Sequence, residues 1–501
     1  MLATLSLAGD VANGLPYETS LRTCAVATVI ADVGGCSAED RDAAWYATLL
    51  RFLGCTAFAH EEALAFSADD VEVRRLFNPV DYGRPVQVMS SAWHAVRAGE
   101  GSPTLGMAKV ASRAPTLRRD LARAACAVGQ RLADRLALAP AVGVALAELH
   151  ERWDGRGVPE ARAADALSVP ARIVHCAALV ETYHRLFGTE AMAAEVQRRA
   201  GGHLDPTLCA AITRDPGALA VPLSAASAWD VAFASAPTSA PATRLEDLTS
   251  VLADFVDLKT PYALGHSRRV ADVATRAARI AGLDEREQTQ LLHAGRVHDL
   301  GHVPVGNDVW EHAGELSTAQ WERVRLHPYH GARALRCSAV LAPLGELAGS
   351  HHERCDGSGY PHGTTAQGLS LAARVLAVAG VYAALREDRP HRPALSLDDA
   401  VDVLAAEERA GRLDRRAVAS VREAIGRPDP GPRNEAGLSD REVEVLVRVA
   451  RGASNKDIAR DLGISAKTVQ HHVRHVYDKT GVRSRAAIAL FAIEHGLVGP
   501  V

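Results

Sequence analysis

The chain has 501 residues, and its 56 Lys and Arg against 60 Asp and Glu give a formal net charge of −4. This length corresponds to about three ordinary domains, and the charge excludes a basic protein that coats nucleic acid along its whole length. Hydrophobic residues make up 48% and charged residues 23% of the chain, which is typical of globular proteins.

The cysteines and the apolar stretches narrow the class of protein further. The eight cysteines contain no C-x-x-C pair, which argues against a zinc ribbon and a redox motif. No stretch reaches the ~18 apolar residues that a membrane span requires, and Met1–Leu7 lacks the basic region of a signal peptide. We expect a cytoplasmic protein without a membrane partner.

Two stretches have the composition of linkers. Residues 214–243 are rich in Pro, Ala and Ser, and residues 426–437 read GRPDPGPRNEAG. They divide the chain into predicted domains at 1–213, 244–425 and 438–501.

The first two domains match each other, which indicates a duplication. LHERWDGRGVP at Leu149–Pro159 matches HHERCDGSGYP at His351–Pro361, and the order of three further matches is the same in both copies. These matches are LSVPARIV with LSLAARVL, GHLD with GRLD, and LPYETSL with TPYALGH.

The apolar pattern predicts helices in both copies. After His266, apolar residues recur at steps of three and four, as at Val270, Val273, Ala274 and Ala277. Aromatic residues are only 5% of the chain, and the alternation typical of strands is nearly absent. We predict an all-α protein.

Histidines concentrate in the second copy, where ten of the 21 lie between His266 and His362. A lone histidine is usually a core or surface residue, but neutral imidazoles grouped with an aspartate are metal ligands. The adjacent pairs His298-Asp299 and His351-His352 therefore indicate a metal site.

The motifs HSRRVADVA, VHDLGH, RLHPYHG, HHERCDGSGYP and AARVLAVAGVY resemble those of HD-GYP phosphohydrolases, over about Leu248 to Val421. The resemblance implies a helical domain that binds two or three ions of iron or manganese and hydrolyses cyclic di-GMP. It also implies that a bridging Asp299 acts in catalysis and that the metal ligands are His266, His298, Asp299, His327, His351 and His352.

Three departures from the family pattern affect this expectation. Gly380 occupies the position of the closing Asp ligand, His302 replaces a Lys that contacts substrate phosphate, and Tyr262 replaces the Glu of three-metal members. The family loop is retained at Asp356, Gly357, Gly359 and Tyr360.

Two interpretations of the second copy therefore stay open. In one, the domain is a phosphodiesterase in which water or His302 completes the weakened metal site. In the other, it binds a metal, a nucleotide or nothing, and serves as a sensor or a dimerisation scaffold.

The first copy has lost the ligand residues. By the sequence match, Leu21 stands opposite His266, Gly54-Cys55 opposite His298-Asp299, and Leu149 opposite His351. Ala178 stands opposite Gly380, and Val158 replaces the Tyr of the loop, while His150 is retained. We expect the fold without its catalytic site.

The C-terminal segment has the pattern of a helix-turn-helix module. Ser439 and Glu442 form a capping box, Gly463 ends the second helix, and Ser465 caps a third helix. Leu438–Leu497 resembles the LuxR-type DNA-binding domain, whose four helices bind double-stranded DNA, usually as a dimer.

The third helix is predicted to contact DNA through the face opposite Val469, Val473 and Val476. Residues 438–501 contain ten Lys and Arg against seven Asp and Glu. The resemblance and this charge give the candidate DNA contacts Lys456, Lys467, Thr468, Gln470, His471, Arg474, Lys479 and Arg483.

The whole arrangement is similar to actinobacterial regulators with tandem HD-GYP-like domains ahead of a LuxR-type domain. We predict a DNA-binding transcription regulator, expected to be a homodimer, whose HD-GYP-like region senses or dimerises and takes a metal or a cyclic dinucleotide. The alternative is a metal-dependent cyclic di-GMP phosphodiesterase with an attached DNA-binding domain.

Overall fold

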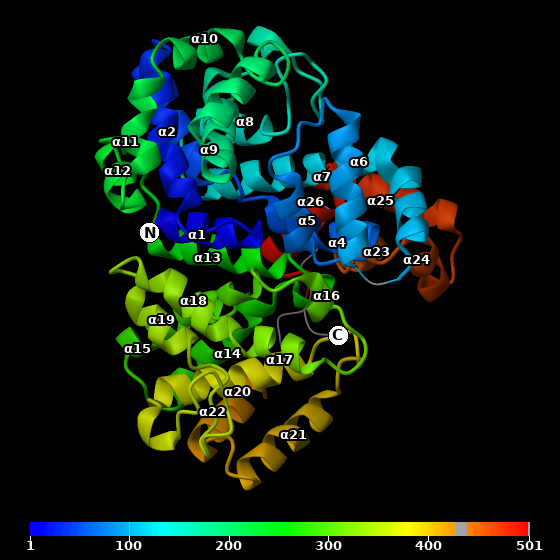
Figure 1. Ribbon diagram of the computed structural model, residues 1–501. Helices are drawn as coiled ribbons and strands as arrows, with labels where there is room; N and C mark the ends of the chain where they lie inside the picture. Colours follow the sequence, from blue (N-terminus) through cyan, green and yellow to red (C-terminus); the bar gives the residue numbers. More distant parts are fainter. Residues whose placement is uncertain (100, 427–435, 437, 499–501) are drawn as a thin grey trace. The chain divides into compact units, whose positions relative to one another are not determined.

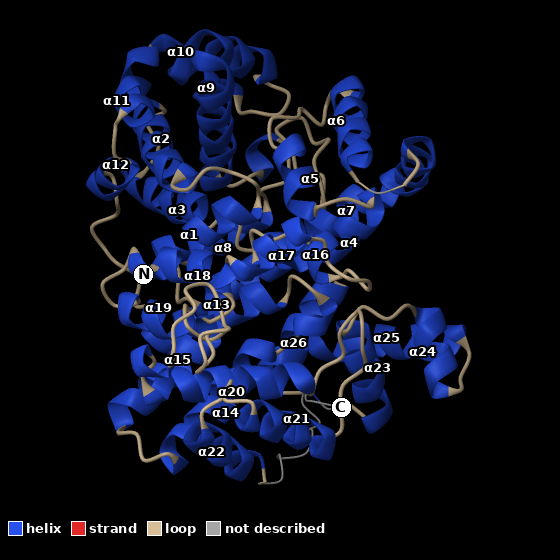
Figure 2. Ribbon diagram, turned by 60° about the horizontal axis from the view of Figure 1, so that its bottom comes forward, coloured by secondary structure: helices blue, strands red, loops and turns tan. Residues whose placement is uncertain are grey.

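The computed structural model describes the whole chain except residues 100, 427–435, 437 and 499–501. The described residues form helices and loops and contain no strand, so the predicted all-α class is confirmed (Figures 1 and 2). The chain divides into two compact units, Leu2–Arg244 and Leu245–Val501. No described helix combines the length and the apolar character that crossing a bilayer requires.

The first unit holds twelve α-helices and three short 3-10 helices among its described residues. The α-helices are α1 (Leu2–Ala12), α2 (Thr19–Val33), α3 (Ala38–Leu49), α4 (Ala59–Phe66), α5 (Asp70–Phe77), α6 (Pro85–Ala98), α7 (Pro103–Arg135), α8 (Pro140–Ala147), α9 (Val169–Arg199), α10 (Pro206–Arg214), α11 (Ala220–Ser224) and α12 (Ala228–Ala234). The 3-10 helices are η1 (Cys55–Phe58), η2 (Ala164–Ala166) and η3 (Pro216–Leu219).

The core of the first unit lies between α2, α9 and α10. Val26, Ile30, Ile173, Val180 and Leu208 are buried in one cluster, because their apolar side chains recur on the inner faces of these helices. A second cluster of buried apolar residues joins α4, α5, α6 and α7.

The linker expected at residues 214–243 is shorter in the structure. α11 and α12 form within this stretch and pack against α2, where Ala228 and Ala232 are buried. Its alanines therefore serve as small residues at a helix contact, which composition alone did not distinguish from a linker. The second predicted linker, 426–437, lies almost wholly outside the described residues.

The second unit begins with an HD-like helical domain of ten described α-helices. These are α13 (Leu245–Asp257), α14 (His266–Ile280), α15 (Glu285–Val297), α16 (Asn307–Trp310), α17 (Thr318–Arg325), α18 (His327–Arg336), α19 (Ala342–Ala348), α20 (Leu371–Leu385), α21 (Leu397–Arg409) and α22 (Arg415–Ile425). Its 3-10 helices are η4 (Pro261–Ala263), η5 (Leu300–His302) and η6 (Ala366–Gly368).

The core of this domain lies where α14, α15, α20 and α22 meet. Val270, Val273, Leu291, Leu376 and Val418 are buried there. The apolar periodicity after His266 thus predicted the inner face of α14 correctly. The core fixes α14 and α20 against each other, and both helices border the histidine cluster.

Four described helices form the C-terminal module: α23 (Asp440–Ala450), α24 (Asn455–Leu462), α25 (Ala466–Thr480) and α26 (Arg485–Glu494). The predicted capping box is present, because Ser439 accepts from the Glu442 backbone N–H and the Glu442 side chain accepts from the Ser439 backbone N–H. Gly463 ends α24 with φ +64°, a left-handed conformation that favours glycine.

The two HD-like copies share a buried hydrogen-bonded pair, and it corrects the sequence match. The Ser20 backbone N–H and hydroxyl donate to Asp10, and those of Ser267 donate to Asp257. α2 begins one residue before Ser20, as α14 begins one residue before Ser267. Thr19, rather than Leu21, therefore occupies the position of His266.

A close glycine contact corrects a second position. A Cβ on Gly54 would lie 2.0 Å from the Ala125 carbonyl oxygen, as a Cβ on Gly301 would lie 1.8 Å from that of His327. Gly54 is therefore equivalent to Gly301, not to His298. The sequence match aligned the Pro-Tyr pair and the alanine-rich segments of the two copies. The structural equivalence of the two copies depends on backbone packing, which the sequence does not display.

Candidate metal centre and DNA-binding surface

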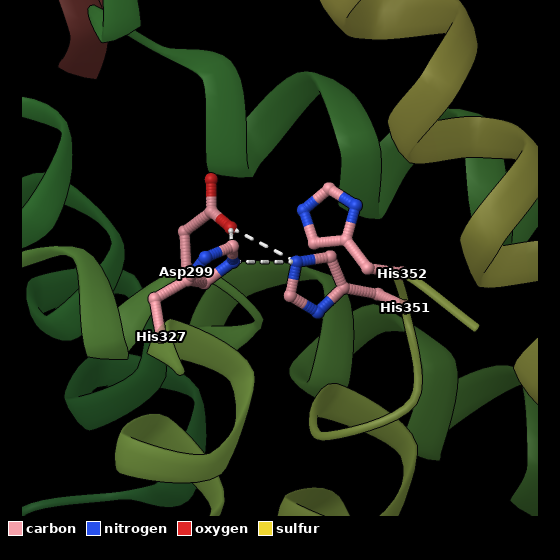
Figure 3. Close-up of side chains that lie close together, drawn as sticks. All are labelled: Asp299, His327, His351 and His352. Atoms are coloured by element: carbon pink, nitrogen blue, oxygen red, sulfur yellow. Dashed lines mark hydrogen bonds and ion pairs between the residues drawn. The ribbon is translucent and has the colours of Figure 1, made fainter. Parts of the chain in front are cut away.

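Asp299 lies at the centre of a buried histidine cluster (Figure 3). It follows the end of α15, while His327 begins α18 and the pair His351-His352 follows α19. Asp299 Oδ1 lies 3.2 Å from His351 Nε2 and 3.6 Å from His327 Nε2. The helix ends thus bring together residues that are far apart in the sequence.

Backbone carbonyls fix the orientation of the rings. Nδ1 of His298, His327 and His351 lies 2.8, 2.6 and 2.5 Å from the carbonyl oxygens of Gly295, Val324 and Ala348. Each Nδ1 therefore donates a hydrogen bond to the carbonyl, and this contact turns Nε2 of each ring toward Asp299.

This arrangement fits a cation. His327 Nε2 lies 3.1 Å from His351 Nε2, so two lone pairs and the Asp299 carboxylate would face one another without a proton between the rings. A positive ion among them would relieve that repulsion. His352 completes one set of four candidate ligands with Asp299, His327 and His351, and a second set contains His266, His298 and Asp299.

The protonation states agree with a ligand role. Burial, partly opposed by the charge of Asp299, lowers the pKa of His298 to about 3. Burial likewise lowers the pKa of His327 and holds that of His352 well below its usual value. Although burial opposes the charge of Asp299, the surrounding imidazoles hold its pKa well below the usual range. Neutral imidazoles and an ionised carboxylate are the forms that bind metals.

Glu387 is a contact that the sequence did not predict. Its carboxylate lies 2.9 Å from His266 Nδ1 and also pairs with Arg269 and with Arg389. Burial favours the neutral ring, but the charge of Glu387 outweighs it and raises the pKa of His266. The only sequence signal was an acidic residue shortly after the segment that ends in Leu385.

Gly380 lies on α20, where the family pattern has its closing aspartate. A Cβ at this position would have no heavy atom within 4 Å, so the space for a side chain is open. The second candidate set therefore has three members, and the Cβ of an aspartate at Gly380 would meet no other atom.

His302 reaches the same centre from η5. Its Nε2 lies 3.2 Å from Asp299 Oδ1, and its ring stacks on Trp310 with a centroid distance of 4.1 Å. Burial lowers the pKa of His302 well below its usual value. His302 is therefore neutral at pH 7 and differs in charge from the Lys of the family pattern.

The loop after His352 packs against the cluster. Tyr360 stacks on His352 with a centroid distance of 4.6 Å, and its backbone N–H donates to the His352 carbonyl. Asp356 accepts from Ser358, Gly357 has φ +83°, and a Cβ on Gly359 would clash with the backbone of Arg354. The loop residues thus hold Tyr360 over one candidate ligand.

The first copy has replaced these ligands. With Gly54 equivalent to Gly301, Arg51 and Phe52 take the places of His298 and Asp299, and Ala125 takes that of His327. Groups of side chains close enough to hold a metal occur, among the described residues, only around Asp299. The expected loss of the first site agrees with this arrangement, with different residues in the lost positions.

The candidate DNA contacts lie on the outside of the C-terminal module. Val469, Val473 and Val476 of α25 are buried, as predicted. The opposite face of the helix is exposed, which leaves its polar side chains available to a ligand. The exposed candidates are Lys456, Lys467, Thr468, Gln470, His471, Arg474, Lys479 and Arg483.

Lys479 differs from the other candidates, because its Nζ lies 2.7 Å from Glu442 Oε2. Glu442 also closes the capping box of α23. Lys479 therefore links α25 to α23, a structural role that sequence spacing did not reveal.

Comparison with known protein families identifies two domains of this chain. Residues 250–417 match the HD domain family, and residues 436–492 match the luxR family of bacterial regulatory proteins. The chain therefore contains an HD domain followed by a LuxR-type helix-turn-helix domain. HD domains are metal-dependent phosphohydrolases, which supports a divalent metal here, and the LuxR-type domain implies DNA binding.

Individual relatives match most of this chain or about a third of it. The chain is 26% identical to 3'3'-cGAMP-specific phosphodiesterase 3 of Vibrio cholerae, over 85% of this chain and 94% of the relative. It is 33% identical to a cyclic di-GMP phosphodiesterase of Pseudomonas aeruginosa, over 35% of this chain and 43% of the relative.

A solved structure shows the same fold. The crystal structure of a cyclic GMP-AMP specific phosphodiesterase of V. cholerae matches with a TM-score of 0.56 and 21% identity, over 85% of this chain and 97% of that one. The homologues of this chain are thus HD-GYP phosphodiesterases of cyclic dinucleotides.

Proposed function

We propose that the protein is a sequence-specific transcription regulator whose second HD domain binds iron or manganese and senses a cyclic dinucleotide. The observation that carries the proposal is the exposed face of α25, where Lys467, Gln470 and Arg474 lie opposite the buried valines. Gln pairs with adenine and Arg with guanine in the major groove, while Lys contacts phosphate.

The residues present fit a metal. Asp299, His327, His351 and His352 would hold one ion, and His266, His298 and Asp299 would contribute to a second. When bound, a divalent metal supplies the positive charge that polarises a phosphodiester. The Asp299 carboxylate keeps its negative charge, three backbone carbonyls orient the imidazoles of His298, His327 and His351 toward it, and Tyr360 covers His352.

The alternative function is hydrolysis of a cyclic dinucleotide. It is favoured by the complete set of four ligands around Asp299 and by the activities in the names of the relatives. Gly380 and His302 weigh against it, because one ligand and one cationic phosphate contact of the family pattern are missing.

Regulation by a ligand requires different affinities for two states of the protein. We propose a homodimer in which a cyclic dinucleotide in the second HD domain changes how the two LuxR-type domains pair on DNA. Such a dimer would favour an operator with two half-sites.

The first experiment measures iron and manganese in the purified full chain by elemental analysis. The variant His351→Ala/His352→Ala should lose the metal, while His94→Ala/His391→Ala, which changes two exposed histidines outside the cluster, should retain it. No metal above the level of the first variant would contradict a metal site.

The second experiment separates the two functions. The full chain selects sites from a DNA library, and binding to the selected site is measured with and without cyclic di-GMP or cyclic GMP-AMP. A change in DNA affinity without hydrolysis supports the regulator that senses a dinucleotide. Hydrolysis of the dinucleotide with unchanged DNA affinity supports the phosphodiesterase, and failure to select any sequence contradicts the DNA-binding function.

A further inference from the structure

The first HD-like copy contains a large cavity. Its volume is about 460 Å³, within the range of about 300–1,000 Å³ that is usual for small-molecule sites. Aromatic and aliphatic side chains form most of its wall, among them Phe52, Phe66, Phe77 and Met107. The cavity is therefore suited to an apolar ligand.

The cavity lies where the second copy holds its histidine cluster. Its wall includes Arg51 and Phe52, which replace His298 and Asp299, and also His150 and Ala178, which are equivalent to His352 and Gly380. Replacement of the ligands by smaller or apolar side chains, such as Leu149, has left open space in place of a metal centre.

Arg51 brings a positive charge into this space. Its Nη1 is buried and has no hydrogen-bond partner among the described residues. Burial lowers the pKa of Arg51, but a guanidinium stays protonated in proteins. The Arg51 side chain also lines the cavity, so an anionic ligand there would gain binding energy from its positive charge.

The acidic groups near Arg51 are committed elsewhere. Both carboxylate oxygens of Asp10 share the Ser20 backbone N–H, one also accepts from the Ser20 hydroxyl, and burial raises the pKa of Asp10 to about 7. Glu181 pairs with Arg185 at 2.7 Å. Neither carboxylate supplies a hydrogen bond to Nη1 of Arg51.

Three other arginines of the cavity wall form ion pairs with carboxylates. Arg74 pairs with Glu62 and Asp70, and Arg152 pairs with Asp81 and Asp154. Arg199 pairs with Glu195. These three arginines form ion pairs within the protein, although Nη2 of Arg74 also lacks a hydrogen-bond partner, whereas Arg51 forms no ion pair among the described residues.

From the apolar wall and the cationic Arg51 side chain that lines it, the structure assigns the first copy a binding site for a hydrophobic carboxylic acid. The carboxylate accepts from Arg51, and the hydrocarbon part fills the space between Phe52, Phe66 and Met107. A carboxylate matches the fork of donors on a guanidinium. A nucleotide is disfavoured, because its many polar groups would face carbon without hydrogen-bond partners.

The test titrates the full chain with dodecanoate, with dodecanol and with dodecyltrimethylammonium by calorimetry. The three probes share one alkyl chain and differ in the charge of the head group. We expect one dodecanoate to bind per chain, dodecanol to bind at least about tenfold more weakly, and the cation to bind weakest, because only the carboxylate can form a charge-assisted hydrogen bond with Arg51.

Two variants examine the two parts of the site. Arg51→Gln should weaken dodecanoate at least about tenfold and change the dodecanol affinity less than about twofold. Ala178→Phe fills the cavity and should abolish binding of both probes while leaving Arg51 in place. Arg156→Gln, on an exposed arginine outside the cavity, is the matched control and should change neither affinity.

Circular dichroism establishes that each variant keeps its helix content. Equal affinities for dodecanoate and dodecanol, binding that survives Ala178→Phe, or the absence of any binding would overturn the proposal. Ala178→Phe leaves the charge of Arg51 unchanged, and Arg51→Gln leaves the cavity open. The two variants therefore test the site independently, and if one fails to fold, the other still tests the proposal.

Discussion

His266 Nδ1 lies 2.9 Å from a carboxylate oxygen of Glu387, and this contact directs the opposite ring nitrogen toward Asp299. His266 Nε2 lies 3.5 Å from Asp299 Oδ2. Arg269 and Arg389 hold Glu387 in turn. A carboxylate behind a histidine fixes the ring and raises its basicity toward a metal, so Glu387 positions a candidate ligand without being one.

Replacing this carboxylate should weaken metal binding. We expect Glu387→Ala to lower the affinity of the full chain for manganese about 10–100-fold, because His266 loses its orienting partner. Competition with a fluorescent chelator measures the change. Glu407→Ala, which removes a carboxylate paired with Arg412 in the same domain, is the control. Equal affinities in both variants would contradict the positioning role.

Restoring an aspartate at position 380 should complete the second set of ligands. Gly380→Asp adds a carboxylate at a position of α20 where the Cβ has open space, so we expect metal content to rise by up to about one equivalent per chain. Gly380→Ala adds the Cβ without the carboxylate and should leave metal content unchanged. Elemental analysis compares the three proteins, and an aspartate variant no richer in metal than the alanine variant would argue against the second site.

Substitutions on α25 should separate base contacts from phosphate contacts. Arg474→Ala should cost about 1–3 kcal/mol on the selected DNA site and relax preference at one base pair. Lys467→Ala should weaken binding to all DNA sequences similarly. It should also reduce the slope of the logarithm of the binding constant against the logarithm of the salt concentration by about one. Arg422→Ala, an exposed arginine of the HD domain, serves as the control in fluorescence anisotropy. Wild-type affinity in the first two variants would exclude this face of α25.

The stability of α23 should depend on pH through Glu442. Burial raises the pKa of this carboxyl, but hydrogen bonds from Lys479 and Ser439 outweigh burial and lower the pKa from 4.5 to about 2. A depressed folded-state pKa means that the contribution is complete above pH 4.5 and is lost as the pH falls toward 2.

We expect Glu442→Gln to lower the local stability of α23 by up to about 1 kcal/mol at pH 7, because Gln can keep the capping box but loses the ion pair with Lys479. Hydrogen exchange of peptides from residues 438–450 in the full chain reports this loss. The difference between variant and wild type should shrink below pH 4.5. A difference that is constant over pH would show that the carboxylate charge does not stabilise the helix. Glu444→Gln, on an exposed residue of the same helix, gives the baseline.

Much of the fold could be predicted from local patterns. The apolar period after His266 and the helix caps at Ser439 and Ser465 depend only on residues close in the sequence. They could therefore be predicted from the sequence alone. The grouping of Asp299 with His327 and His351 followed from a family resemblance, since nothing local brings these distant residues together.

Features that depend on packing could not be predicted. Arg51 was not recognised in the place of His298, because only the approach of Gly54 to Ala125 fixes that equivalence. Glu387 lies far in the sequence from His266, whose ring it contacts. α12 formed in a stretch that composition assigned to a linker, because its alanines are buried against α2.

The exchange of a histidine for Arg51 has a practical consequence for any study of the intact chain. A guanidinium is a covalent part of the protein, so a chelator cannot remove its charge, whereas the charge expected beside Asp299 must be acquired from solution. Treatment with a chelator would therefore remove the positive charge expected in the second copy and leave that of Arg51 in the first copy unchanged. Each half of the molecule would then serve as an internal reference for the other.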